Sequence, residues 1–398
     1  MTTEQTTLPS PRASVLALLN DAIAVRRDLH RHPELSTEEH RTQQVILERL
    51  RALGLDDVRA VAGTGATALV RGGQPGPNIL WRADIDALPI EEATGLEFAS
   101  ENEGVMHACA HDGHVAIALA LAEALQASRA SLRGSVRFAF QPAEERIGGA
   151  VGMIEAGVMD DPPTDAVYGL HIWSTDAAGT LSVVPGPIFA AATHMRIIVR
   201  GRGGHASAPQ TTIDPIVVAA HVIVALQTVV SRSVDPAETA VLTIGRIEGG
   251  ARGNIIPDEV KMSGTMRTFE PQVSERMIAR VEQIVAGVTA AWGAEYRFDH
   301  STLPAVVNDA RCAGVVEAVG RAFLGDDHVS AQRITGADDM AYYLQRAPGA
   351  YFLLGAADPA GRPRAHHSAQ FDFDERAIGL GIEVALRIIE TETGSKLG

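Results

Sequence analysis

Short apolar runs alternate with helical patterns along the first half of the chain. Four of these runs predict strands, at Ala66–Val70, Asn78–Arg82, Val136–Phe140 and Ala166–Ile172. An Ala- and Leu-rich stretch predicts a helix between them, from about His114 to Gln126. An earlier helix is expected to open at the capping box Ser36-Thr37-Glu38-Glu39 and to end at Gly54. Alternating strands and helices are typical of an α/β sheet with helices on both faces.

The pattern changes near Pro185-Gly186-Pro187. The stretch that follows predicts four strands, at His194–Gly201, Thr239–Ile247, Glu259–Phe269 and Glu295–Ser301. A helix is predicted after the first strand, capped by Asp214, with Pro215 at its first position and its end at Ser231. A second helix is predicted after the third strand, at Gln272–Trp292. That βαββαβ order is the ferredoxin-like unit, which is a complete small domain.

After Leu303-Pro304 the first pattern resumes, with a helix near Ala310–Leu324, a strand at Ala350–Gly355 and a final helix from about Asp374 to Thr391. A chain of 398 residues is also too long for one ordinary hydrophobic core. We therefore expect one α/β domain formed by residues 1–187 and 304–398, with the βαββαβ domain inserted at residues 188–303.

Composition narrows the range of partners. The formal net charge of -15 argues against nucleic acid and anionic membranes, because both demand a basic surface. No run of eighteen consecutive apolar residues occurs, so no membrane-spanning helix is expected. Residues 1–12 lack the basic and then apolar segments of a signal peptide, and the cytoplasm is the expected location. Of the two cysteines, Cys312 lies in an apolar helical stretch and is expected to be a buried structural thiol.

Side chains that suit metal ions follow the predicted strands. Cys109 and His111 stand two residues apart in the run MHACAHD, and the adjacent carboxylates Glu144 and Glu145 follow the strand that ends at Phe140. His171 lies at the end of another predicted strand, and His367 precedes the last helix. Open α/β sheets bind ligands at the carboxyl ends of their strands. Cys109, His111, Glu145, His171 and His367 would supply enough ligands for two adjacent divalent ions if Cys109 bridges them.

Each part of this pattern also has a plainer explanation. Taken alone, a buried thiol and a capping histidine would explain Cys109 and His111 about as well as a metal site does. A cysteine hydrolase with Cys109 as nucleophile and His111 as base is a rival, although it leaves Glu144 and Glu145 without a role. A non-catalytic binding protein that keeps the fold for dimerisation or small-molecule sensing is a second rival.

The ordered motifs resemble those of a known enzyme family. The runs WRADIDALPI from Trp81, MHACAHDGH from Met106, QPAEE from Gln141, GLH from Gly169, GRGGHASAP from Gly201 and HHSAQFDFDE from His366 look like the aminoacylase and hippurate-hydrolase branch of the dinuclear metallopeptidases. That branch also includes the plant auxin-conjugate hydrolases. The match runs in order from about Arg26 to Glu375. It implies a metal-dependent amidohydrolase that splits an N-acyl amino acid into a carboxylic acid and a free amino acid.

The resemblance also implies roles for individual residues in the α/β domain. It makes Cys109, His111, Glu145, His171 and His367 the ligands of two divalent ions per subunit, and it makes Glu144 the general base for a metal-activated water. Zinc or manganese is the first expectation, with cobalt and nickel as alternatives, because selectivity depends on geometry and supply. Asp86 would orient a metal-binding histidine. One departure is visible, since the family usually has glycine where this chain has Ala110.

In the inserted domain the resemblance implies a lid that forms a homodimer. The lid histidine, His205, would hydrogen-bond the developing oxyanion in the partner subunit's site, whereas an exposed loop histidine explains it equally well. Asn254 and Arg267 look like substrate-gripping residues, and the plainer explanation of Arg267 is a solvent-facing strand residue. The turn Gly336-Ala337-Asp338-Asp339 is expected to shape the substrate pocket and to cap the next helix.

Overall fold

The computed structural model of the chain describes residues 8–360 and 364–398. These residues divide into two compact units. Unit 1 comprises the residues up to Ile188 together with Val307–Gln332 and Asp339–Gly398, and unit 2 comprises Phe189–Val306 together with Arg333–Asp338. Each unit is described by itself below.

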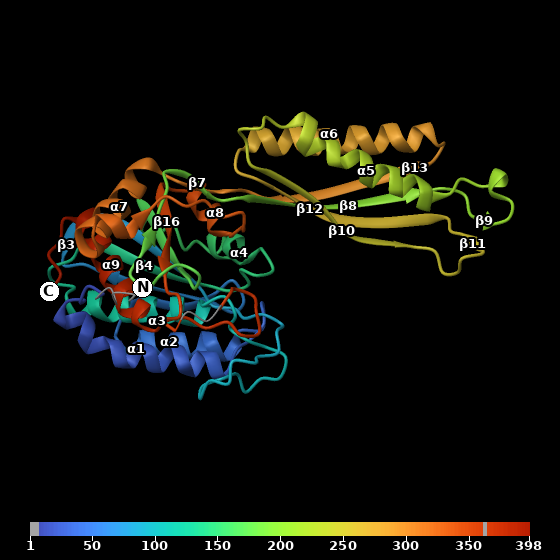
Figure 1. The fold of residues 1–398 in the computed structure, drawn as a ribbon. Helices are drawn as coiled ribbons and strands as arrows, with labels where there is room; N and C mark the ends of the chain where they lie inside the picture. The colour runs from blue at the N-terminus through green and yellow to red at the C-terminus, as the bar shows by residue number, and fades with distance from the viewer. Residues whose placement is uncertain (1–7, 361–363) are drawn as a thin grey trace, which may run out of the picture. The chain divides into compact units, whose positions relative to one another are not determined.

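Unit 1 is built on one large mixed sheet (Figure 1). Its eight strands lie in the order β1-β2-β4-β3-β5-β16-β6-β15. Their bounds are β1 Asp56–Val61, β2 Gly65–Arg71, β3 Gln74–Asp84, β4 Arg133–Gln141, β5 Ala166–Trp173, β6 Leu181–Ser182, β15 Val329–Ser330 and β16 Gly349–Gly355. The four central strands β4, β3, β5 and β16 run parallel. Their carboxyl ends therefore meet at one edge of the sheet, where loops can bring distant residues together.

Helices flank this sheet, which confirms the predicted α/β class. They are α1 Ala13–Arg31, α2 His40–Ala52, α3 His111–Ala127, α4 Gly149–Glu155, α7 Ala310–Leu324, α8 Met340–Leu344 and α9 Arg376–Thr393, with a short 3-10 turn at Asp326–His328. The helix α3 packs against strands β3 and β5 and also contacts α1 and α9. Because neighbours cover α3 on several sides, it is apolar nearly all round, and residues from His111 to Ala122 are buried.

The predicted capping box is wrong. The helix α2 begins at His40, and Glu39 makes no side-chain cap. Ser36 instead donates to Asp86 at 2.6 Å, while Glu39 accepts from Thr64 and, at 2.8 Å, from the backbone N–H of Ala143. Both side chains therefore hold loops at the edge of the sheet in place. Their hydrogen bonds to residues far away in the chain outweigh the local preference for capping. Gly54, in the left-handed region at φ 68°, follows the helix end as predicted.

Unit 2 has the predicted βαββαβ order, with α5 and α6 on one face of a four-stranded antiparallel sheet (Figure 1). Its strand order is β10-β12-β8-β13, the ferredoxin-like arrangement. The bounds are β8 Ala191–Arg200, α5 Pro215–Ser233, β10 Ala240–Gly249, β12 Glu259–Thr268, α6 Pro271–Ala291 and β13 Glu295–Leu303. A short ladder joins β9 Gly204–His205 to β11 Ile255–Ile256, and a 3-10 turn spans Pro209–Thr211. A second short ladder joins β7 Gly186–Phe189 to β14 Val306–Asn308, and most of its residues belong to unit 1.

The helix α5 starts as the sequence predicts, with Pro215 at its first position and the Asp214 side chain accepting from the N–H of Ile216. One face packs into the core of unit 2 through Val218, Val222, Leu226 and Val229. Although no run of eighteen apolar residues predicts it, α5 is also long and apolar enough to cross a membrane, by length and composition only. One such helix is weak evidence for a membrane span, because the core helix of a soluble protein passes the same test; in α5, 28% of the apolar window is buried.

The segment Arg333–Asp338 belongs to unit 2, although the predicted boundaries assigned it to the α/β domain. The backbone N–H of Ala190 donates to the carbonyls of Ile334 at 3.0 Å and Gly336 at 2.9 Å. Phe189 also forms an isolated parallel bridge with Ile334. These are backbone contacts between residues far apart in the chain, so no local sequence pattern predicts them.

Candidate metal centre

The candidate ligands of unit 1 meet at the carboxyl edge of its parallel strands. Asp84 ends β3, Glu144 and Glu145 follow β4, and His171 lies near the end of β5. Cys109 directly precedes α3, and His111 is that helix's first residue. The topology of the sheet thus brings together residues from four separate segments between Asp84 and His171, as their places after the strands predict.

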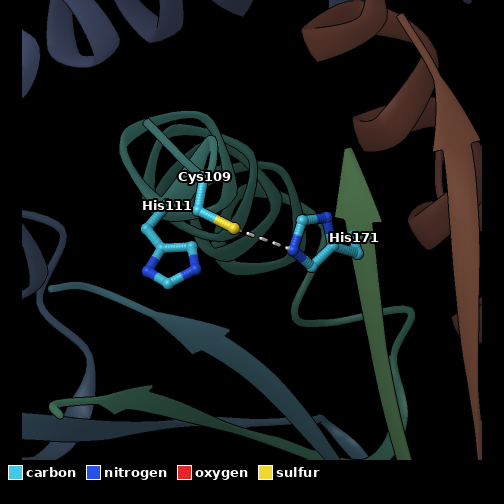
Figure 2. Close-up of side chains that lie close together, drawn as sticks. All are labelled: Cys109, His111 and His171. Atoms are coloured by element: carbon cyan, nitrogen blue, oxygen red, sulfur yellow. Dashed lines mark hydrogen bonds between the residues drawn. The ribbon is translucent and has the colours of Figure 1, made fainter. Parts of the chain in front are cut away.

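Cys109 belongs to two groups of side chains that could hold a metal ion. One group is Cys109, His111 and His171, and the other is Cys109, Glu145 and His367; in each group the ligand atoms lie within 4.8 Å of one another. Figure 2 shows Cys109 between the first pair of imidazoles, with its Sγ atom 3.5 Å from His171 Nε2. A shared thiolate with two further ligands on each side is an arrangement that suits a pair of adjacent divalent ions.

Hydrogen bonds fix which nitrogen of each imidazole faces the cluster. His111 Nδ1 lies 2.9 Å from the carbonyl oxygen of Asp86, and His171 Nδ1 lies 2.8 Å from that of Ile172. A carbonyl only accepts, so in both rings Nδ1 carries the hydrogen and Nε2 keeps its lone pair in the neutral form. Metal-binding histidines usually have this arrangement, in which the second nitrogen donates to the protein.

The Asp86 carboxylate lies between several parts of the cluster. Its Oδ1 is 3.2 Å from His111 Nδ1, and its Oδ2 accepts from the backbone N–H of Glu145 at 3.1 Å and from Ser36. The pKa of Asp86 is lowered: burial opposes ionisation, but hydrogen bonds from His111 and Ser36 outweigh it. Asp86 therefore holds two candidate ligands in register with each other.

Asp84 has different partners from Asp86. It is fully buried, pairs with the Arg82 guanidinium and accepts from His114 Nδ1. His114 Nε2 in turn accepts the N–H of Ile172 at 2.9 Å. The Asp84 carboxylate is thus held by the side chains of Arg82 and His114. It anchors His114, which steadies the strand that carries His171.

Three of the loops that carry candidate ligands contain a left-handed residue that is not glycine. Ala110 has φ 67°, Ala143 has φ 51°, and His367 itself has φ 60°. Such conformations cost of order 1–3 kcal/mol each and cluster at functional sites. The Ala110 position therefore does require positive φ, which explains why the resembling family uses glycine there. The contact from Ala143 to the buried Glu39 helps to hold one of these loops.

The electrostatics of the cluster favour a bound cation. Burial disfavours a charged imidazole, yet the carboxylates of Asp84 and Asp86 raise the pKa of His111 to about 10. Burial and the nearby Glu145, Glu144 and Asp84 charges raise the pKa of Cys109. The Oε1 atom of Glu145 is buried and lies 3.3 Å from His367 Nε2. Within the described residues this oxygen has no hydrogen-bond partner. This surplus of negative groups and a spare carboxylate oxygen fit divalent metal ions.

His366 and His107 flank the predicted ligands without having been assigned to them. His366 Nδ1 lies 3.8 Å from Cys109 Sγ, a contact that the sequence analysis missed. Its only sequence signal is its place beside His367 in a double-histidine motif. His107 is buried, and neither ring nitrogen has a hydrogen-bond partner in the described parts of the chain; burial lowers its pKa to about 4. His107 is therefore a neutral packing group.

The remaining predicted residues all belong to unit 2. His205 and Asn254 are exposed, and the N–H of Ala206 donates to the Asn254 carbonyl at 3.2 Å. Arg267 is partly buried on β12, and desolvation lowers its pKa. No ion pair of Arg267 is found within residues 8–360 and 364–398, so its guanidinium is available to an anion. Gly336 is exposed in the returning segment.

The expected helix cap after Gly336 is wrong. Asp339 precedes α8 but makes no side-chain cap. Its Oδ1 accepts from Arg82 at 3.0 Å and from Gln141 at 2.7 Å, and its Oδ2 accepts from the N–H of Ala150. A buried guanidinium requires a carboxylate partner, and this requirement outweighs a helix cap worth about 1 kcal/mol.

The chain is similar in sequence and in structure to several known proteins. The sequence model of Peptidase family M20/M25/M40 matches residues 80–391. N-acetyl-L-cysteine deacetylase of Bacillus subtilis is 41% identical over 94% of this chain and 90% of its own length. N-acyl-L-amino acid amidohydrolase of Geobacillus stearothermophilus is 44% identical over 73% of this chain and 78% of its own. A Bacillus subtilis crystal structure described as a dinuclear metal binding peptidase from the M20 family has 33% identity and a TM-score of 0.83, covering 96% of this chain and 100% of that one.

Proposed function

The chain belongs to peptidase family M20/M25/M40, and on this premise we propose that it is a metal-dependent amidohydrolase that cleaves an N-acyl amino acid into a carboxylic acid and a free amino acid. The relatives named as N-acetyl-L-cysteine deacetylase and N-acyl-L-amino acid amidohydrolase support this reaction class. The observation that carries the proposal is the pair of ligand groups that share Cys109. Glu144 belongs to a third group with His111 and Glu145, so a proton-transfer group lies beside the ligands.

In this proposal Cys109, His111, Glu145, His171 and His367 hold two divalent ions, and zinc or manganese is the expected metal, with cobalt or nickel as alternatives. When bound, such ions polarise a substrate carbonyl and lower the pKa of a water toward about 7. A reducing, cytoplasmic setting is part of the proposal, because Cys109 must stay free of disulfides to act as a ligand.

Glu144 is the general base of the proposed reaction. Its carboxylate takes a proton from the attacking water and returns it to the leaving nitrogen, since an amide anion is a very poor leaving group. Glu144 and Glu145 are neighbours in the chain, so one carboxylate can bind metal while the other moves protons. Asp86 acts indirectly, through its contacts with His111 and Glu145.

The partner subunit's His205 is proposed to donate a hydrogen bond to the developing oxyanion. Its Nδ1 lies 3.1 Å from the backbone N–H of Ser207, which can only donate. In a neutral ring Nε2 must then carry the hydrogen, so His205 presents a donor to solvent. Asn254 and Arg267 are proposed to grip the substrate, with the guanidinium on its carboxylate, and Gly336 to shape its pocket.

We propose that unit 2 forms the homodimer. The outward face of α5 exposes Ile216, Val217 and Val224, and the edge strand β10 exposes Val241 and Ile247. An edge strand with apolar side chains invites pairing, and a second copy of the same strand is the natural partner in a two-fold dimer. Such pairing would bury apolar surface that an isolated subunit leaves in water.

Hydrolysis of a panel of acetyl, benzoyl, long-acyl and indole-acetyl amino acids tests this function. At least one member should be cleaved, with activity lost on chelation and restored by a divalent metal. The matched control is the same compound with its carboxylate converted to an amide, which should react about tenfold more slowly or worse because Arg267 loses its partner. Cleavage that survives chelation would favour the cysteine hydrolase instead. Inactivity on the whole panel would favour the non-catalytic binding protein.

A further inference from the structure

His366 occupies an enclosed position behind the candidate ligands. Its ring lies 4.5 Å from that of Trp173, 5.0 Å from that of Phe371 and 5.2 Å from that of His171, measured between centroids. The backbone on either side is anchored as well: Ser174 Oγ donates to the carbonyl of Arg364, and the N–H of His367 donates to the carbonyl of Ala108 at 2.8 Å. These contacts fix both the position and the plane of the His366 ring.

The hydrogen bonds of His366 determine its tautomer. Its Nε2 accepts the backbone N–H of Ser174 at 3.2 Å. A backbone N–H can only donate, so Nε2 must carry a lone pair, and the hydrogen of the neutral ring must sit on Nδ1. That nitrogen lies 3.8 Å from Cys109 Sγ, within range for a hydrogen bond to sulfur. The ring is therefore oriented to donate to Cys109.

His171, which also lies within hydrogen-bond range of Cys109 Sγ, cannot do the same. His171 Nε2 is 3.5 Å from the sulfur, but its Nδ1 is committed to donating to the Ile172 carbonyl. In the neutral form His171 therefore faces the sulfur with a lone pair, as a metal ligand would. Of these two imidazoles in hydrogen-bond range of Cys109 Sγ, only His366 directs an N–H at the sulfur.

We propose that His366 is a positioning residue whose Nδ1–H donates a hydrogen bond to the Cys109 thiolate and so tunes the bridge between the two metal ions. The inference rests on the proposed function, because it requires Cys109 to be a metal ligand. A donor to a metal-bound thiolate draws electron density from the sulfur and fixes the direction of its remaining lone pairs. Partners of this kind are typically worth 10- to 100-fold in metal affinity or activity.

Two pairs of variants separate donation from packing. His366→Phe keeps an aromatic ring between Trp173 and Phe371 but has no donor. His366→Asn keeps an amide N–H near the place of Nδ1, whereas His366→Gln moves its amide toward the place of Nε2. Phe371→Leu is the packing control, since it changes the contacts of the His366 ring without removing the N–H.

The readout is the sulfur-to-cobalt charge-transfer band of the cobalt(II)-loaded protein, together with cobalt affinity. A hydrogen bond stabilises the sulfur lone pairs, so its loss should move the band to longer wavelength in His366→Phe and His366→Gln. Cobalt affinity should fall about 10- to 100-fold in the same two variants. His366→Asn and Phe371→Leu should keep the wild-type band. If His366→Phe does not fold, the comparison of His366→Asn with His366→Gln decides by the same criterion.

Two negative results have different meanings. A band that stays at the wild-type wavelength in both His366→Phe and His366→Gln, or that moves equally in His366→Asn, overturns the role of His366 and leaves the proposed function standing. Absence of any sulfur-to-cobalt band in the wild-type protein would show that Cys109 is not a ligand. That result overturns the metal assignment and the role of His366 together.

Discussion

Glu144→Ala is expected to lose nearly all turnover while keeping its fold and its bound metal. General bases typically contribute about 10²–10⁴-fold to the rate, and more is at stake here because the same carboxylate also returns a proton to the leaving nitrogen. The measurement is kcat on the best N-acyl amino acid, with metal content and thermal unfolding determined on the same preparation. Glu144→Gln, which keeps the size of the side chain, should be equally inactive.

Glu145→Ala is the matched neighbour of that variant. In the wild-type protein the Glu145 carboxylate lies 3.3 Å from the His367 imidazole, in a candidate ligand group. The loss of this carboxylate should therefore remove bound metal as well as activity. A Glu144→Ala enzyme within a few-fold of wild type would assign the base elsewhere. Equal loss of metal in both variants would contradict the proposal that Glu145 binds metal while Glu144 only transfers protons.

Mixing two inactive variants is expected to restore activity. If the partner subunit's His205 completes each site, a heterodimer of His205→Ala and Glu144→Ala subunits has one site with both groups intact. Random exchange of equal amounts makes about half of the dimers heterodimers, each with one active site of two, so about a quarter of wild-type activity should return. The measurement is activity after the two proteins are denatured and refolded together, against each variant refolded alone.

The mixing experiment is informative only if the two variants are shown to have exchanged subunits. Differently tagged subunits show by co-purification that mixed dimers have formed. Mixed dimers as inactive as either parent would mean that His205 acts within its own chain or has no catalytic role. The same tags also test the dimer, because a monomeric wild-type protein would rule out sharing from the start.

Much of the fold could be predicted from the sequence because its elements have strong local signals. Helix α7 was predicted at Ala310–Leu324, where the structure has it, and α5 begins at its predicted cap, Asp214. The βαββαβ order followed from apolar periodicity, since each strand and helix buries one face against the same small core. The ligand cluster could be anticipated because residues after parallel strands converge at one edge of a sheet.

The failures share a physical cause, which is that distant partners outweigh local preference. Ser36, Glu39 and Asp339 have good capping side chains, yet all three hold groups far away in the chain. The left-handed conformation of Ala110 comes from the loop that presents Cys109 and His111, and nothing in the residue itself announces it. The role of His366 depends on a backbone N–H at Ser174, which no side-chain motif can encode.

The proposed dinuclear metal centre, with Cys109 as the shared ligand, can be tested by measuring metal content. Wild-type protein, Cys109→Ser and Cys312→Ser should be loaded with metal, freed of excess and analysed by mass spectrometry for metal ions per chain. Cys312 is the matched control, because it is the other free cysteine and is buried in α7. We expect two ions per chain in wild type and in Cys312→Ser. In Cys109→Ser we expect fewer than two, with a matching loss of activity, since a hydroxyl is a poor substitute for a bridging thiolate. Two tightly bound ions and full activity in Cys109→Ser would contradict the proposal.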